Sequence, residues 1–283
     1  MTSETQVDIP AVQERARRMR LDIVEMIGAA GSGHPGGSLS AADILATLYF
    51  GGVLRHDPHD PSWPGRDRFV LSKGHAAPVL YAALAAAGYF GREHLTTLRK
   101  LGSILQGHPD SSKTPGVEVS TGSLGQGLSI ANGIALGLGA DSDSNVFCLL
   151  GDGECQEGQV WEAAMFAAHH RLDRVIAIVD HNGLQIDGRC QDVMNLGEIA
   201  EKFRAFGWNV LGADGHDIAS LLSAFAEAKT AEGAPTVVVC LTHKGRGVSF
   251  MEDNADWHGK APSAQECETA ADELCQLTEG GGR

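Results

Sequence analysis

A carboxylate and a carboxamide each follow an apolar run, and together they could hold a divalent cation. Asp152 lies in the G-D-G-E motif that follows the apolar run 146–150, and Asn182 lies in the D-H-N-G motif that follows the apolar run 175–179. Mg²⁺ takes carboxylate, amide, main-chain and phosphate oxygens as ligands. Gly153 has no side chain, so its N–H could approach a diphosphate closely. The alternative is that Asp-Gly and Asn-Gly form two ordinary turns.

These two motifs depend on the strands that precede them. A helical pattern separates the two apolar runs, which therefore belong to one parallel βαβ unit. Ligands of open parallel sheets bind beyond the carboxyl ends of the strands. Further short apolar strands are predicted at 68–71, 208–211 and 235–241. The fold class is therefore α/β, with a parallel sheet of about five strands and helices on both faces.

Helices are predicted between and around these strands. The ranges are 12–28, 77–87, about 127–139, 195–206 and 217–229, with one more from a Ser38 or Ser40 cap to about 50. A capping box, Ser263-x-x-Glu266, opens a last helix. Residues 280–283 are expected to be a frayed tail. Without repeats or an evident linker, residues 1–283 are predicted to be a single domain that ends in an acidic helix and tail, 261–283.

Charge, hydropathy and cysteine content argue against some kinds of partner and favour a reducing compartment. The formal charge of −14 argues against binding to nucleic acid or an anionic membrane, but it leaves phosphorylated small molecules open. No apolar run approaches about 18 residues, and the polar start of the chain carries no signal core, so no membrane span is expected. Six cysteines without a C-x-x-C pair are interpreted as reduced thiols of a cytoplasmic protein.

Four histidines stand out because each follows glycine or tryptophan in a turn-like segment. They are His34, His75, His108 and His258. A single histidine of this kind is usually a loop residue. Four of them suggest imidazoles that donate to an anion and move protons near neutral pH.

Taken together, these segments resemble the N-terminal, diphosphate-binding portion of transketolase. The matching segments are GHPGGS at 33–38, SKGHA at 72–76, QGHP at 106–109, TGSLGQG at 121–127, the motifs of Asp152 and Asn182, and DWHGK at 256–260. The resemblance covers residues 12 to 260. One departure is Ser123, where many full-length relatives carry proline.

The resemblance implies a thiamine-diphosphate-binding fold with thiamine diphosphate and Mg²⁺ as cofactors. It assigns the metal to Asp152, Asn182 and the carbonyl of Leu184, and the diphosphate to His75, Gly153, Asn182 and His258. It places Gly122, Ser123 and Leu124 against the cofactor rings. It assigns His34, His108 and His258 to the sugar hydroxyls and to proton transfer. The implied reaction moves a two-carbon glycolaldehyde unit from a ketose phosphate to an aldose.

The resemblance also implies a partner, because the family continues for roughly as long again. That second portion carries the glutamate that contacts the aminopyrimidine ring and most sugar-phosphate contacts. The chain is therefore predicted to be the N-terminal subunit of a split transketolase. It would work with a C-terminal, pyrimidine-binding subunit in an α2β2 assembly. Glu157 and Glu162 either meet their mates across a subunit interface, as the family implies, or merely favour the N-terminus of a helix.

Other interpretations stay open. A related thiamine-diphosphate synthase shares the metal motif, although the segments around His34 and His258 favour transketolase. A non-catalytic thiamine-diphosphate-binding module would retain the same cofactor residues. A dinucleotide-binding domain is disfavoured, because no G-x-G-x-x-G follows an early strand.

Overall fold

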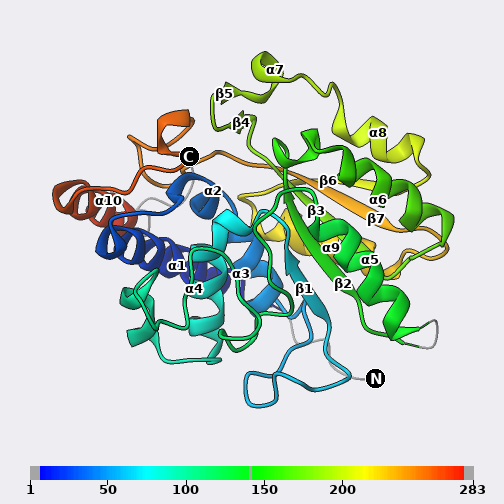
Figure 1. Ribbon diagram of the computed structural model, residues 1–283, viewed down its shortest axis with the longest axis horizontal. Helices are drawn as coiled ribbons and strands as arrows, with labels where there is room; N and C mark the ends of the chain where they lie inside the picture. Colours follow the sequence, from blue (N-terminus) through cyan, green and yellow to red (C-terminus); the bar gives the residue numbers. More distant parts are fainter. Residues whose placement is uncertain (1–6, 140–141, 277–283) are drawn as a thin grey trace.

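The architecture is a five-stranded parallel sheet between two layers of helices. The computed structural model describes residues 7–139 and 142–276 (Figure 1). The strand order is β1 (Arg68–Leu71), β2 (Val146–Gly151), β3 (Val175–His181), β7 (Thr236–Leu241) and β6 (Asn209–Asp214), and every pair is parallel. The predicted fold class is confirmed.

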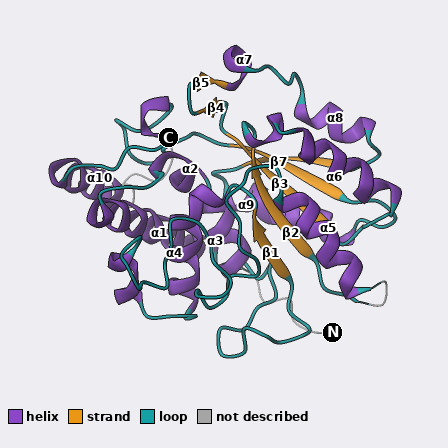
Figure 2. Ribbon diagram, viewed as in Figure 1, coloured by secondary structure: helices purple, strands orange, loops and turns teal. Residues whose placement is uncertain are grey.

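Both faces of the sheet are buried, as a parallel sheet requires. On one side lie α1 (Ile9–Ala30), α3 (Ala42–Phe50), α4 (Ala77–Ala87), α9 (Ile218–Thr230) and α10 (Ala264–Gln276) (Figure 2). On the other side lie α5 (Gly127–Leu138), α6 (Gly158–His169) and α8 (Ile199–Ala205). Successive residues of β2 alternate between the two cores: Phe147 faces the first and Cys148 the second. This alternation explains why the central strands have no polar face.

Helix boundaries follow local capping chemistry. Asp8 accepts a hydrogen bond from the N–H of Ala11 (3.1 Å), and Gly31 closes α1 with a left-handed φ of 62°. The capping box before α10 is confirmed. The N–H of Ser263 donates to Glu266 (2.7 Å), and the N–H of Glu266 donates to the Ser263 hydroxyl (3.3 Å). The predicted frayed tail at 280–283 lies outside the described residues.

The predicted serine cap near residue 40 is wrong. Two helices replace the single predicted one, because α2 (Pro35–Ser40) ends before α3 begins. The Ser38 hydroxyl donates to the His34 carbonyl (2.8 Å), and the Ser40 hydroxyl donates to the Asp180 carboxylate (2.6 Å). Both hydroxyls act as donors, whereas a cap must accept a main-chain N–H.

Several short elements that the sequence did not predict connect the main helices and strands. They are the hairpin β4 (Leu184–Gln185) and β5 (Gly188–Arg189), α7 (Cys190–Val193), and the 3₁₀ turns η1 (Gly74–Ala76), η2 (Arg92–Thr97), η3 (Glu154–Gln156) and η4 (Ala255–Trp257). Each is too short to show periodicity. Over residues 7–139 and 142–276, no helix is both long and apolar enough to span a bilayer.

Candidate cofactor site

The predicted metal ligands meet at the carboxyl edge of β2 and β3. Pairing of Gly151 with Asp180 brings the loops after the two strands side by side. Asp152 is buried, and its carboxylate accepts hydrogen bonds from the N–H groups of Gly183 (2.6 Å) and Gly153 (2.8 Å). The carboxylate is therefore held directly against the loop that carries Asn182.

The Asn182 side chain has a defined orientation. Its Nδ2 donates to Asp180 (3.1 Å), and its Oδ1 accepts from the N–H of Leu184 (3.1 Å). The Leu184 carbonyl accepts a hydrogen bond from the Lys244 ammonium (3.3 Å), and both residues line the same pocket. The three predicted metal ligands thus border one pocket.

These donors fit a magnesium–diphosphate group. Burial and the neighbouring Asp180 carboxylate raise the pKa of Asp152, and a bound cation would relieve that cost. Mg²⁺ prefers such oxygen donors and completes its shell with phosphate or water oxygens. Within the described ranges no three His, Cys, Asp or Glu side chains converge as a ligand set. A cation here would therefore depend on oxygens that the cofactor brings.

Next to this edge lies a cavity of about 190 Å³ with basic side chains in its wall. Lys73, Lys244, His75 and His258 line it together with Leu124 and the loop 151–154. An anionic diphosphate suits such a wall. Burial and the proximity of Lys73 lower the pKa of Lys244 to about 8.

Gly153 has a second reason to be glycine. A Cβ at this position would lie 2.9 Å from the Cβ of Gln185, so the loop that follows β2 packs directly against the β4–β5 hairpin. Its N–H donates to the carboxylate of Asp152 in the structure. The role of Gly153 in diphosphate binding stays a prediction.

Three of the four singled-out histidines form one cluster. Ring centroids are 5.1 Å apart for His75 and His258, 5.2 Å for His34 and His75, and 5.4 Å for His34 and His258. His108 lies against Gly122, where a Cβ would come within 3.1 Å of its ring. Its loop is fixed by the Tyr81 hydroxyl, which donates to the His108 carbonyl (3.1 Å).

All four imidazoles are neutral near pH 7. Burial lowers the pKa of His34 to about 4 and of His258 to about 3, and it lowers the pKa of His75 well below the usual value. Burial, assisted by nearby Arg99, also lowers the pKa of His108. The Lys244 ammonium donates to Nδ1 of His258 (2.9 Å), so the proton of neutral His258 is on Nε2.

Sequence reasoning missed several residues that build this pocket. Lys73 forms a buried ion pair with Asp180, and Lys244 contacts both Leu184 and His258. Buried Glu154 accepts from the Ser72 hydroxyl and from the N–H groups of Gly125 (2.9 Å) and Gly151 (3.0 Å). The signal available was position: Lys73 and Lys244 also lie just beyond predicted strands.

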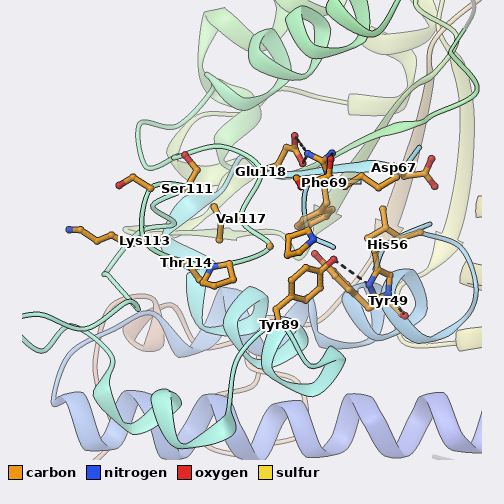
Figure 3. Close-up of a pocket in the computed structure, with 17 residues that line it drawn as sticks. Tyr49, His56, Asp67, Phe69, Tyr89, Ser111, Lys113, Thr114, Val117 and Glu118 are labelled. Atoms are coloured by element: carbon orange, nitrogen blue, oxygen red, sulfur yellow. Dashed lines mark hydrogen bonds and ion pairs between the residues drawn. The ribbon is translucent and has the colours of Figure 1, made fainter. Parts of the chain in front are cut away.

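A separate cavity of about 400 Å³ lies near the start of β1 (Figure 3). Tyr89 and His56 approach each other there (3.4 Å), and Glu118 binds the Arg66 guanidinium at 2.9 Å (Figure 3). The charged side chains of this cavity pair with one another. The predicted metal ligands and the basic side chains lie at the opposite end of β1.

The fold and the site define a class of protein. Oxygen ligands for a hard cation and a basic wall for an anion lie side by side at the carboxyl edge of a parallel sheet, which is the arrangement expected of a protein that holds a metal–diphosphate group.

Comparison with known proteins gives the family. The sequence model described as "Transketolase, thiamine diphosphate binding domain" matches residues 11–276. The chain belongs to this family.

Two relatives match over almost their entire length. Both are named as transketolase subunits. The 6-deoxy-6-sulfo-D-fructose transketolase subunit of Clostridium sp. (strain MSTE9) is 46% identical over 96% of this chain and 98% of its own length. The apulose-4-phosphate transketolase subunit of Phocaeicola vulgatus is 41% identical over 97% of this chain and 96% of its own.

A solved structure matches in fold and extends well beyond this chain. The transketolase of Campylobacter jejuni superposes with a TM-score of 0.88 and 34% identity, over 95% of this chain but 43% of the larger one. More than half of that transketolase therefore has no counterpart in the present sequence.

Proposed function

We propose that the chain is the N-terminal subunit of a two-chain transketolase that uses thiamine diphosphate and Mg²⁺. The assembly would transfer a two-carbon glycolaldehyde unit from a ketose phosphate to an aldose acceptor. The observation that carries the proposal is the meeting of Asp152, Asn182 and the Leu184 carbonyl beside a cavity lined by Lys73 and Lys244. The names of the two relatives matched end to end support the assignment to a transketolase subunit.

The inner residues would bind the cofactor's charged end. Asp152, Asn182 and the Leu184 carbonyl would hold Mg²⁺, while Lys244 and His75 would donate to diphosphate oxygens. When bound, thiamine diphosphate supplies the nucleophilic carbon that accepts and passes on the two-carbon unit. Leu124 lines the pocket and would provide an apolar contact to the cofactor, with Gly122 and Ser123 in the same loop.

The outer imidazoles would bind the sugar. A neutral imidazole has one donor and one acceptor nitrogen, so His34, His108 and His258 can orient hydroxyl groups, and His34 and His108 can also take up or return a proton. The N–H of His258 is on Nε2 because Nδ1 accepts from Lys244. That nitrogen is therefore fixed as a donor for a substrate oxygen or a phosphate.

The partners would be a C-terminal transketolase subunit that binds the pyrimidine ring and a second copy of each chain, giving α2β2. The outer sides of α5 and α6 expose Leu136, Met165 and Phe166 to 47%, 49% and 41%. Exposed apolar side chains on neighbouring helices suit an interface. Glu157 and Glu162 are exposed on the same side of the fold, where they could meet a partner chain.

Several finer assignments remain part of the proposal. A role in pentose phosphate or related sugar metabolism follows from the transketolase assignment. A cytoplasmic location is supported by the buried free thiols Cys148, Cys155 and Cys240. The prediction of a single domain over residues 1–283 also stays a prediction.

The test is reconstitution with a C-terminal transketolase subunit from the same genome. The two purified chains would be assayed, separately and mixed, with a ketose phosphate, 6-deoxy-6-sulfo-D-fructose and apulose 4-phosphate as donors. The expected result is thiamine-diphosphate-dependent transfer by the mixture alone. Transfer by this chain alone would contradict the split-enzyme proposal.

The same experiment separates the alternatives. Cofactor binding without turnover in the mixture would favour a non-catalytic module. Condensation of pyruvate with a triose phosphate would favour the related synthase.

A further inference from the structure

A fully buried carboxylate, Asp180, lies beside the proposed metal ligands without being one of them. It accepts hydrogen bonds from the Ser40 hydroxyl (2.6 Å), from Nδ2 of Asn182 (3.1 Å), from the Thr242 hydroxyl and from the Lys73 ammonium. These donors come from α2, from the ends of β1 and β3, and from the end of β7. One side chain therefore joins four segments that border the cofactor pocket.

The Lys73 ammonium matches the charge of this carboxylate. Both side chains are almost inaccessible, at 2% and 0% exposure, and Lys73 also donates to the Gly37 carbonyl (2.8 Å). A buried charge without a partner is costly, so the pair is held in its ionised form. An ionised carboxylate only accepts hydrogen bonds.

This property decides which end of the Asn182 amide points where. An amide presents an oxygen at one end and an NH₂ group at the other, and only the oxygen can bind a cation. Since Asp180 can only accept, it selects the NH₂ end of Asn182. The amide oxygen is left near the N–H of Leu184, in the wall of the cofactor pocket.

We propose that Asp180 is a positioning residue that keeps the Asn182 oxygen turned toward the metal. The inference rests on the proposed function, because it assumes that a metal binds between Asp152 and Asn182. Partners of metal ligands typically contribute roughly 10- to 100-fold to metal affinity.

The test uses the full chain, thiamine diphosphate and Mn²⁺ as a spectroscopic probe for the metal. Asp180→Leu removes the acceptor for the Asn182 NH₂ group, so the amide is free to turn and its oxygen is no longer held toward the metal. The affinity for Mn²⁺ is expected to fall by roughly 10- to 100-fold.

The conservative variant Asp180→Asn provides the rescue. Lys73, Ser40 and Asn182 all donate to Oδ2 of Asp180, whereas the Thr242 hydroxyl donates to Oδ1. The new amide can therefore place its oxygen at the first position, where it still accepts from Asn182, and its NH₂ group beside the Thr242 hydroxyl. Affinity for Mn²⁺ is expected to stay within about threefold of that of the unmodified chain. If the ion pair with Lys73 set the affinity, Asp180→Asn would be as weak as Asp180→Leu.

A matched control is Thr242→Val, which removes another donor to Asp180 and leaves the contact to Asn182 in place. It should change Mn²⁺ affinity by less than about threefold. If Asp180→Leu does not fold, Asp180→Leu/Lys73→Met carries the test, because it removes both buried charges together. Lys73→Met alone is then its reference.

The outcomes separate the two proposals. If the unmodified chain with thiamine diphosphate does not bind Mn²⁺, the proposed metal site is wrong. If it binds Mn²⁺ but Asp180→Asn is as weak as Asp180→Leu, or if Asp180→Leu binds normally, the positioning role is overturned and the proposed function stands.

Discussion

The inner and outer regions of the cofactor site differ in how complete they are. The inner region contains Lys73, Asp152, Glu154, Asp180 and Lys244, and each is at most 3% exposed. Its polar groups are satisfied by hydrogen bonds within the chain. A cofactor would meet a largely preformed wall there.

The outer region is open and partly apolar. Ile186 at the rim of the pocket is 62% exposed. Beyond the pocket, the apolar surface continues on α5 and α6, where Leu136 and Phe166 are 47% and 41% exposed. Ser123 and Gln126, in the loop proposed to face the cofactor rings, are exposed as well. The difference supports the proposal that this chain provides the site for the charged end of the cofactor and that a partner chain provides the rest.

The largest effect is expected from a substitution of Asp152 in the inner region. Asp152→Ala removes a proposed metal ligand and leaves the Gly183 N–H without its acceptor. Affinity for Mn²⁺ in the presence of thiamine diphosphate should fall by more than about 100-fold, beyond the effect of changing a ligand's partner. Electron paramagnetic resonance of Mn²⁺ measures it. An unchanged affinity would show that the cation binds elsewhere.

The anion-binding part of the inner region is tested at Lys244. A hydrogen bond to a charged group contributes about 1.5–3 kcal/mol, so Lys244→Met should weaken thiamine diphosphate binding by roughly 10- to 100-fold. Isothermal titration calorimetry measures the change.

Lys260→Met is the matched control for this prediction. Lys260 lies over the Trp257 ring (4.1 Å) and does not line the cofactor pocket, so the affinity should change little. Equal losses in both variants would mean that general electrostatic attraction, and not a specific contact, binds the cofactor.

The outer region is tested by adding charge to its exposed apolar surface. Phe166→Arg should raise the dissociation constant of the assembly by about tenfold, because a charge would be buried in the proposed interface. Sedimentation of the mixed chains would reveal smaller species. Ala226→Arg, at an exposed position of α9 on the other side of the sheet, should leave the assembly intact.

The smallest expected effect concerns pH. The lowered pKa values of His34, His75 and His258 mean that the unfolded chain binds more protons than the folded chain below the unperturbed histidine pKa. The free energy of unfolding of the cofactor-free chain should therefore decrease as the pH falls from 7 to 5. Urea unfolding at each pH measures it, and His258→Gln should make the decrease smaller. A steeper decrease in that variant would contradict the assignment of His258 as neutral.

Much of the fold could be predicted because the signals are local. Apolar runs marked the strands 68–71, 146–150 and 175–179, and Ser263 with Glu266 marked the start of the last helix. The break between α2 and α3 escaped because Ser38 and Ser40 look like caps in sequence. Ser40 instead donates to Asp180, which is 140 positions away.

Part of the candidate site could also be predicted from the sequence. Asp152 and Asn182 follow strands that pair in register, so their proximity could be expected from the βαβ pattern. The ion pair of Lys73 with Asp180 and the contact of Lys244 with His258 could not. A long flexible side chain can reach several neighbours, and no spacing rule indicates which of them it meets.

By itself, the sequence determined the alternation of strands and helices and the residue types at the strand ends, because periodicity and turn chemistry act over a few neighbouring residues. Only the tertiary structure decided that Asp180 would be the common acceptor of four segments and that the histidines would be neutral. Those properties depend on burial and on partners brought together from distant parts of the chain.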